Sequence, residues 1–152
     1  MKSLISTAAS LTVLMSASAI ADDHTGSADF ELTHVAAVLN TGPVDPTHDE
    51  QCDALLSDHV GLHAHSSWEV NTTTGMMSAT TTVMDAEIGM FPMGISGHYD
   101  FMSSSIPSGL SEQHVDRVIL NMDDTFENQA LRILFVYDDQ DFNCVLSSDA
   151  MH

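Results

Sequence analysis

Two β-forming runs near the C-terminus constrain the fold more than any other part of this sequence. Residues 130–137 are rich in β-forming residues, residues 138–141 are rich in aspartate, and residues 142–146 return with a second apolar run. This pattern predicts an antiparallel hairpin, because successive side chains of a strand point to opposite faces of its sheet. A one-residue slip would exchange the faces, so two inward sets stay open. They are Leu131, Ile133, Phe135 and Tyr137, or Leu134 and Val136.

A second hairpin is predicted in the middle of the chain. Residues 68–70 would pair with residues 76–84 across a polar loop that ends at Gly75. On the second arm, one face would carry Met77, Ala79, Thr81 and Val83. Weaker patterns predict further strands over residues 30–39, 97–102 and 115–122, the last of which could instead be a helix that starts at Ser111.

One helix is predicted near residues 48–60. Thr47 and Glu50 form a T-x-x-E capping box, Pro46 precedes it, and Gly61 is a suitable stop. The residues expected on its buried stripe are Cys52, Leu55, Leu56, His59 and Val60. About seven short strands and one helix favour a mainly β fold, either a small antiparallel sandwich or a barrel, with an α+β domain as the alternative.

The N-terminus has the three zones of a secretory signal peptide. A cation at Lys2 is followed by an apolar stretch, and Ala19 and Ala21 fit the small-x-small cleavage rule. The apolar stretch is shorter than the roughly 20 residues that cross a bilayer, so we do not expect a membrane span. We therefore expect residues 1–21 to be removed and residues 22–152 to form a single domain in the periplasm or outside the cell.

The expected domain is strongly acidic. Residues 22–152 hold all 22 acidic residues and no lysine, and their basic side chains are Arg117 and Arg132. A field of this sign repels nucleic acid and anionic membrane surfaces. Two explanations stay open: solubility in a salty medium, or an acidic face that attracts cations or a basic protein.

Cys52 and Cys144 are the two cysteines of the chain. In an oxidising compartment such a pair is most simply a disulfide bond. The bond would tie an early element to the last strand and would stabilise the fold by about 4–5 kcal/mol on the chain-entropy model.

Both predicted hairpins show a family resemblance. Residues 134–145 (LFVYDDQDFNCV) resemble a hairpin that recurs in concanavalin A-like and laminin-G-like jelly-roll domains, and residues 68–70 (WEV) with their Gly-bearing turn are similar to an earlier hairpin of that group. The resemblance covers about 25 residues and implies a β-sandwich fold. It contains no catalytic motif.

The densest group of potential ligands is His59-x-x-x-His63-x-His65. Imidazole suits zinc and copper, and residues two apart on a strand share a face, so His63 and His65 with His59 or His98 could form a metal site. The same stretch, with Glu69 and His98, partially resembles the metal motifs of cupin barrels, which would imply a metal enzyme. The alternative is a set of unliganded surface histidines.

A methionine-rich set could bind Cu(I) through thioethers, although methionine is more often core filler. Its members are Met76, Met77, Met84, Met90, Met93, His98 and Met102.

No signature of an enzyme is otherwise found, so we expect a binding or accessory protein more than a catalyst. The main alternative to metal binding is a carbohydrate-binding or protein-binding β-sandwich. In such a module Trp68 or Tyr99 would stack on the ligand, and the histidines would be incidental.

Overall fold

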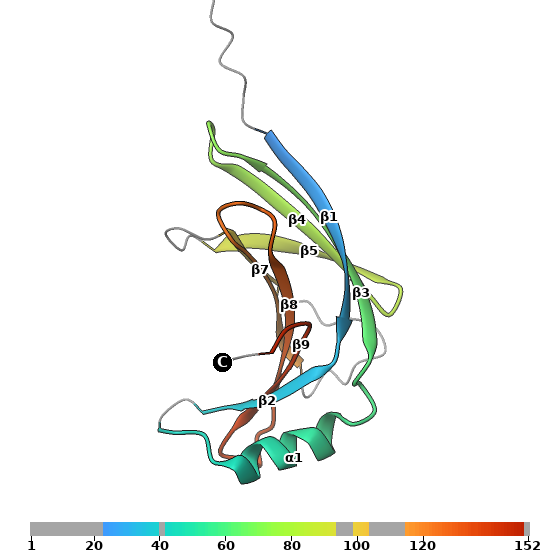
Figure 1. The fold of residues 1–152 in the computed structure, drawn as a ribbon, viewed down its shortest axis with the longest axis vertical. Helices are drawn as coiled ribbons and strands as arrows, with labels where there is room; N and C mark the ends of the chain where they lie inside the picture. Colours follow the sequence, from blue (N-terminus) through green and yellow to red (C-terminus); the bar gives the residue numbers. More distant parts are fainter. Residues whose placement is uncertain (1–22, 40–41, 94–98, 104–114, 151–152) are drawn as a thin grey trace, which may run out of the picture.

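The computed structural model describes residues 23–39, 42–93, 99–103 and 115–150, and these form a mainly β fold with one short helix (Figure 1). The prediction of a mainly antiparallel β fold is confirmed. The elements are β1 (Asp23–Leu32), β2 (His34–Val38), α1 (Pro46–Leu56), β3 (Leu62–Asn71), β4 (Met76–Val83), β5 (Ala86–Met93), β6 (Tyr99–Ser103), β7 (Val115–Met122), β8 (Gln129–Val136) and β9 (Asn143–Ser147).

The nine strands form one curled antiparallel sheet in the order β1-β3-β4-β5-β6-β7-β8-β9-β2 (Figure 1). The sheet turns two corners. At Thr33 the chain passes from β1, which pairs with β3, into β2, which pairs with β9 at the other edge. β5 makes the second corner, because its first part pairs with β4 and residues Phe91, Pro92 and Met93 pair with β6.

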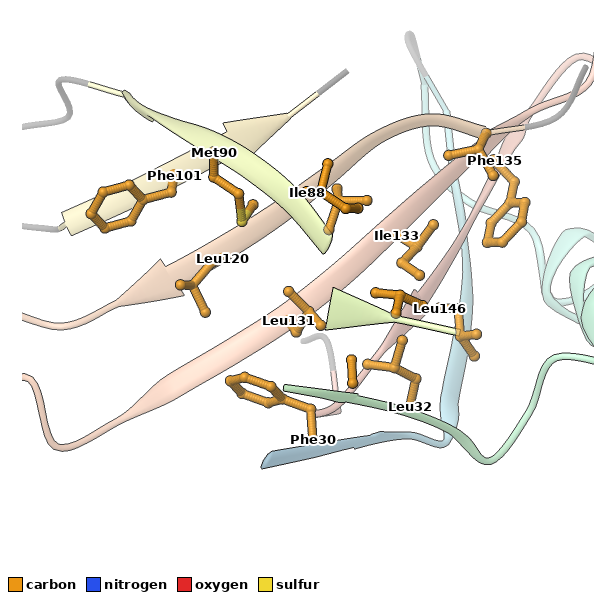
Figure 2. Close-up of a cluster of buried hydrophobic side chains, with 14 of the residues drawn as sticks. Phe30, Leu32, Ile88, Met90, Phe101, Leu120, Leu131, Ile133, Phe135 and Leu146 are labelled. Carbon is orange, nitrogen blue, oxygen red and sulfur yellow. The ribbon is translucent and has the colours of Figure 1, made fainter. Parts of the chain in front are cut away.

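The inner face of this curl holds the hydrophobic core (Figure 2). Side chains from both halves of the sheet meet there, and the largest buried ones include Phe101, Phe135, Leu32, Leu120, Leu131, Ile133 and Leu146. Ser66 and Thr81 are buried among them, and their hydroxyls lie 2.8 Å apart in a hydrogen bond. This pairing satisfies two polar groups that would otherwise be costly to bury.

Both predicted hairpins are confirmed. β8 and β9 pair around the aspartate-rich turn, and the inward set is the one with Leu131, Ile133, Phe135 and Tyr137. β3 and β4 pair around residues 72–75, with Ala79, Thr81 and Val83 buried and Met77 packed against the core. The larger apolar set of each strand therefore faces inward.

The weaker strand predictions are confirmed in outline. Residues 30–39 contain the end of β1 and all of β2, and residues 99–102 fall within β6. Residues 115–122 form β7 and not a helix, since they pair along their length with β8. Gly97, His98 and residues 111–114 lie outside the described residues. β5 was not predicted, because Gly89 and Pro92 interrupt its apolar pattern.

The predicted start of the helix is wrong by two residues. Asp45, not Thr47, is the N-cap: its carboxylate accepts a hydrogen bond from the Thr47 amide at 2.7 Å, and the Asp45 amide donates a hydrogen bond to Nδ1 of His48. Pro46 then occupies the first helical turn, where its missing N–H is harmless. Of the five residues predicted on the buried side of the helix, only Cys52 and Leu56 are buried within it. Leu55 is exposed, and the helix ends at Leu56, before His59 and Val60.

The predicted disulfide bond is present between Cys52 of α1 and Cys144 of β9. It fixes the helix against one end of the curled sheet, next to β2 and β9 (Figure 1). The Asp49 carboxylate adds a hydrogen bond from the Ala37 amide of β2 at 2.8 Å. A disulfide suits the oxidising compartment expected from the N-terminal sequence.

None of the helices in the described part of the chain is long and apolar enough to cross a membrane. The expected signal peptide, residues 1–21, lies outside the described residues.

Candidate functional site

The outer surface of β1, β3 and β4 carries the histidine pair singled out in the sequence, and we call this surface the β3 face. His63 and His65 are both exposed on β3, because the residues between and beyond them, Ala64 and Ser66, point into the core. Across the ladder, His63 lies opposite Glu31 and His65 lies opposite Asp29. The prediction that the two imidazoles share a strand face is confirmed.

One of these imidazoles is held by a carboxylate. Nδ1 of His65 lies 2.7 Å from Oδ1 of Asp29, with the two side chains 50% and 91% exposed. An ionised carboxylate can only accept, so Nδ1 carries the proton of this bond. In the neutral ring, Nε2 is then left with a free lone pair.

Three hollows follow one another along the β3 face. The first, about 360 Å³, is lined by Asp29, His63, His65, Thr82, Met84 and Asp85, among others. The second, about 210 Å³, includes Thr25, Ser67, Glu69, Ser78 and Thr80. The third, about 280 Å³, shares Glu69 and Ser78 with the second and ends at Asp23, Asn71 and Met76. Together they outline an elongated surface that runs the length of β3.

The charge of this surface is uniformly acidic. Its carboxylates are Asp23, Asp29, Glu31, Glu69 and Asp85. The two arginines of residues 22–152 lie instead on β7 and β8. Arg117 pairs with Asp116, and Arg132 binds Asp149 at 3.1 Å and Asn121. Among the described residues, the β3 face therefore has no lysine or arginine to neutralise its carboxylates.

Of the two histidines proposed as a third ligand beside His63 and His65, His59 lies elsewhere. The His59 ring stacks on Phe135 with centroids 5.8 Å apart, so it packs on β8 and not beside His63. His98 lies outside the described residues. Within the described parts of the chain, no group of three or more His, Cys, Asp or Glu side chains is placed to hold a metal ion.

Of the two aromatic residues proposed to stack on a ligand, Trp68 is buried and Tyr99 is partly buried. Trp68 is 7% exposed, and its indole lies over Gly26 of β1. Tyr99 stacks on Phe126, whose other contact is the ring of His24, with centroid distances of 4.5 and 4.4 Å. The Trp68 ring thus belongs to the core, and one face of the Tyr99 ring packs on Phe126.

The methionine set is divided between core and surface. Met90 is buried and its sulfur accepts a hydrogen bond from Thr81, while Met77 packs against the core. Met76 is 73% exposed, and Met84 is exposed at the turn between β4 and β5. Only part of the set is core filler.

Sequence reasoning missed Asp29 and Phe91, and it did not place Met84 beside the histidines. Asp29 is distant from His65 in sequence, so nothing local revealed their pairing. Met84 reaches the histidine hollow because it turns the chain with a positive φ of 50°. Phe91 is 72% exposed on β5. In the sequence it falls on the same side of the strand as Glu87, away from Ile88 and Met90, and an apolar side chain at such a position could have indicated a binding surface.

No family model, curated protein or solved structure matches this chain, and the resemblance to jelly-roll domains stays a prediction.

Proposed function

We propose that this protein is an exported binding module that takes up cationic ligands on its β3 face. The observation that carries the proposal is the line of three hollows along β3, each of which has a carboxylate in its lining and none of which contains a lysine or arginine.

The two sides of the sheet differ in what they can offer a ligand. The inner positions of β1, β3 and β4 are filled by the core, including Phe30, Trp68 and Val83. The outer positions carry hydroxyl, carboxylate and imidazole groups that remain in solvent. A ligand of this half of the molecule would therefore approach the outer surface.

Charge selects the class of ligand. Carboxylates spread along one strand attract an extended cation, such as a polyamine or a basic peptide segment, and neighbouring Ser and Thr hydroxyls can accept or donate hydrogen bonds. Each exposed ion pair contributes little, so binding would depend on several contacts at once and weaken with salt.

A second candidate is carbohydrate binding, for which Phe91 is the favourable feature. Its ring is 72% exposed, and the neighbouring Gly89 leaves open space on the same side of β5. An exposed aromatic ring of this kind can stack on a sugar. In this second candidate function, Phe91 replaces Trp68 and Tyr99 as the residue that would stack on a sugar.

The test is a titration of the ¹⁵N-labelled protein with spermine, followed by NMR chemical shifts at low salt and at physiological salt. We expect saturable shifts along β1, β3 and β4 that weaken as salt rises. Glu69→Gln, which removes the charge shared by two hollows, should weaken binding about two- to fivefold. Glu50→Gln removes an equal charge from the exposed side of α1 and should leave the affinity unchanged.

Equal weakening by the two variants would show diffuse attraction to an acidic protein and would overturn the proposal. So would an absence of spermine binding. Maltohexaose serves as the neutral probe: shifts around Phe91 that disappear in Phe91→Ala, without spermine binding, would favour the carbohydrate candidate.

A further inference from the structure

The hollow at the His63 end of the β3 face has a chemistry that the rest of the surface lacks. It combines two imidazoles, those of His63 and His65, with the thioether of Met84 and the carboxylates of Asp29 and Asp85. The two histidines come from alternate positions of one strand, so a rigid backbone holds them on the same side.

The bond between Asp29 and His65 prepares one imidazole for a metal ion. Metal-binding histidines usually give their second ring N–H to a carboxylate or carbonyl, which fixes the tautomer and makes the ligand nitrogen more basic. The 2.7 Å contact from Nδ1 of His65 to Asp29 is an arrangement of this kind. It leaves Nε2 of His65 as the ligand atom.

The surroundings are open enough for an ion that keeps part of its water. The hollow measures about 360 Å³, His65 is half exposed, and Glu31 stands opposite His63 on β1. The adjacent carboxylates add a negative potential that raises the local concentration of divalent cations. Imidazole ligands select zinc, copper or nickel over magnesium and calcium, which prefer oxygen.

We propose that His63 and His65 bind one divalent transition-metal ion, with Asp29 as the positioning residue for His65 and with water completing the coordination. This inference rests on the proposed function, because the metal would be a cation held at one end of the β3 face. The site has two protein ligands and excludes His59, whose ring packs on Phe135.

Zinc titration of the metal-free protein tests this site by calorimetry, with imidazole NMR signals as a second readout. The protein should keep a blocked or extended N-terminus, since a free amine at Asp22 would create a competing chelate with the backbone amides and His24. We expect one Zn²⁺ per chain and selective shifts of the His63 and His65 rings.

Three variants and one control make the test specific. His63→Ala and His65→Ala should each abolish the one-site binding, and Asp29→Asn should weaken it about tenfold while leaving both rings responsive to the ion. His34→Ala removes an exposed imidazole from β2 and should bind zinc as the unaltered protein does. All four positions are exposed, so circular dichroism should show an unchanged fold.

Binding that survives the combined His63→Ala and His65→Ala changes would overturn the inference, as would the absence of any zinc binding or an equal loss in His34→Ala. Spermine titration of the same variants separates the two proposals. If spermine binds to the β3 face and zinc does not bind, the metal site fails alone. If neither binds, the proposed function fails as well.

Discussion

The two halves of the curled sheet share one core but differ on their outer surfaces. In β3, exposed and buried residues alternate almost strictly, whereas the outward positions of β8 are half-buried. The outer side of β7, β8 and β9 carries Ile119, Leu134 and Val145, of which Val145 is buried. The outer side of β1, β3 and β4 carries mostly charged and polar groups in solvent.

This difference fits a division of the sheet between a stabilising half and the half proposed to bind ligands. The half formed by β7, β8, β9 and β2 is anchored by the disulfide bond, by α1 and by the arginine contacts of Arg132. The half formed by β1, β3 and β4 contributes its inner face to the core and leaves its outer face available. We infer that stability concentrates in the first of these halves and ligand contact in the second.

The largest loss of stability is expected from removing the disulfide bond. The combined Cys52→Ser and Cys144→Ser variant should lose about 4 kcal/mol of unfolding free energy, because the unfolded chain is no longer closed over 92 residues. Urea denaturation measures the change. A loss below about 1 kcal/mol would show that the helix and β9 are held mainly by packing, and it would weaken the contrast between the halves.

A smaller loss of stability is expected from a change on the inner face of the half formed by β1, β3 and β4. In Gly26→Ala the new methyl group would lie 2.6 Å from Cζ2 of Trp68, so we expect a loss of about 1–3 kcal/mol from overpacking. Gly89→Ala is the matched control, since its methyl group would meet nothing within 4 Å. Thermal unfolding of both proteins is the measurement, and equal stability would contradict the placement of Trp68 against β1.

The smallest effect concerns the turn between β7 and β8. A hydrogen bond from the Asn128 side chain, aided by Thr125 and by backbone amides, lowers the pKa of Asp123 to about 2. A lowered pKa in the folded state means that the ionised form stabilises the turn above pH 4 and that this stability is lost as the pH falls toward 2.

Asp123→Asn should therefore be less stable than the unaltered protein at pH 7, and the difference should shrink between pH 4 and pH 2. Urea denaturation across this range gives the comparison. Asp124→Asn removes the same charge from the same turn and serves as the control. A difference between the Asp123 variant and the unaltered protein that does not change with pH would contradict this role.

The sequence predicted the hairpins and the disulfide bond because those depend on local alternation and on a single possible cysteine pair. It did not predict which residues meet across strands. The pairing of Asp29 with His65 depends on the β1–β3 register, which no local pattern encodes. The helix start was misplaced because Asp45 and Thr47 are both good caps, and Pro46 fits best when Asp45 takes that role.

The candidate site could be predicted only in part, because alternation along a strand shows which face a residue lies on but not which residues of other strands meet it. His63 and His65 follow from strand alternation, and the same alternation turns Trp68 toward the opposite side of β3. A ligand that contacts the two histidines on the outer face therefore cannot also stack on that indole. His59 belongs to the turn after α1, where its ring meets Phe135 and not the β3 face.

The passage from β1 into β2 at Thr33 has a consequence for how the chain reaches its native state. β1 pairs with β3 soon after it in sequence, but β2 must wait for β9, the last strand of the chain. Contacts between such distant segments form slowly, because a long loop has to close before they gain any stabilisation. Until β9 arrives, β2 has no strand to pair with and the two cysteines stay apart. The pairing of β2 and the disulfide bond are therefore completed only when the final strand is available.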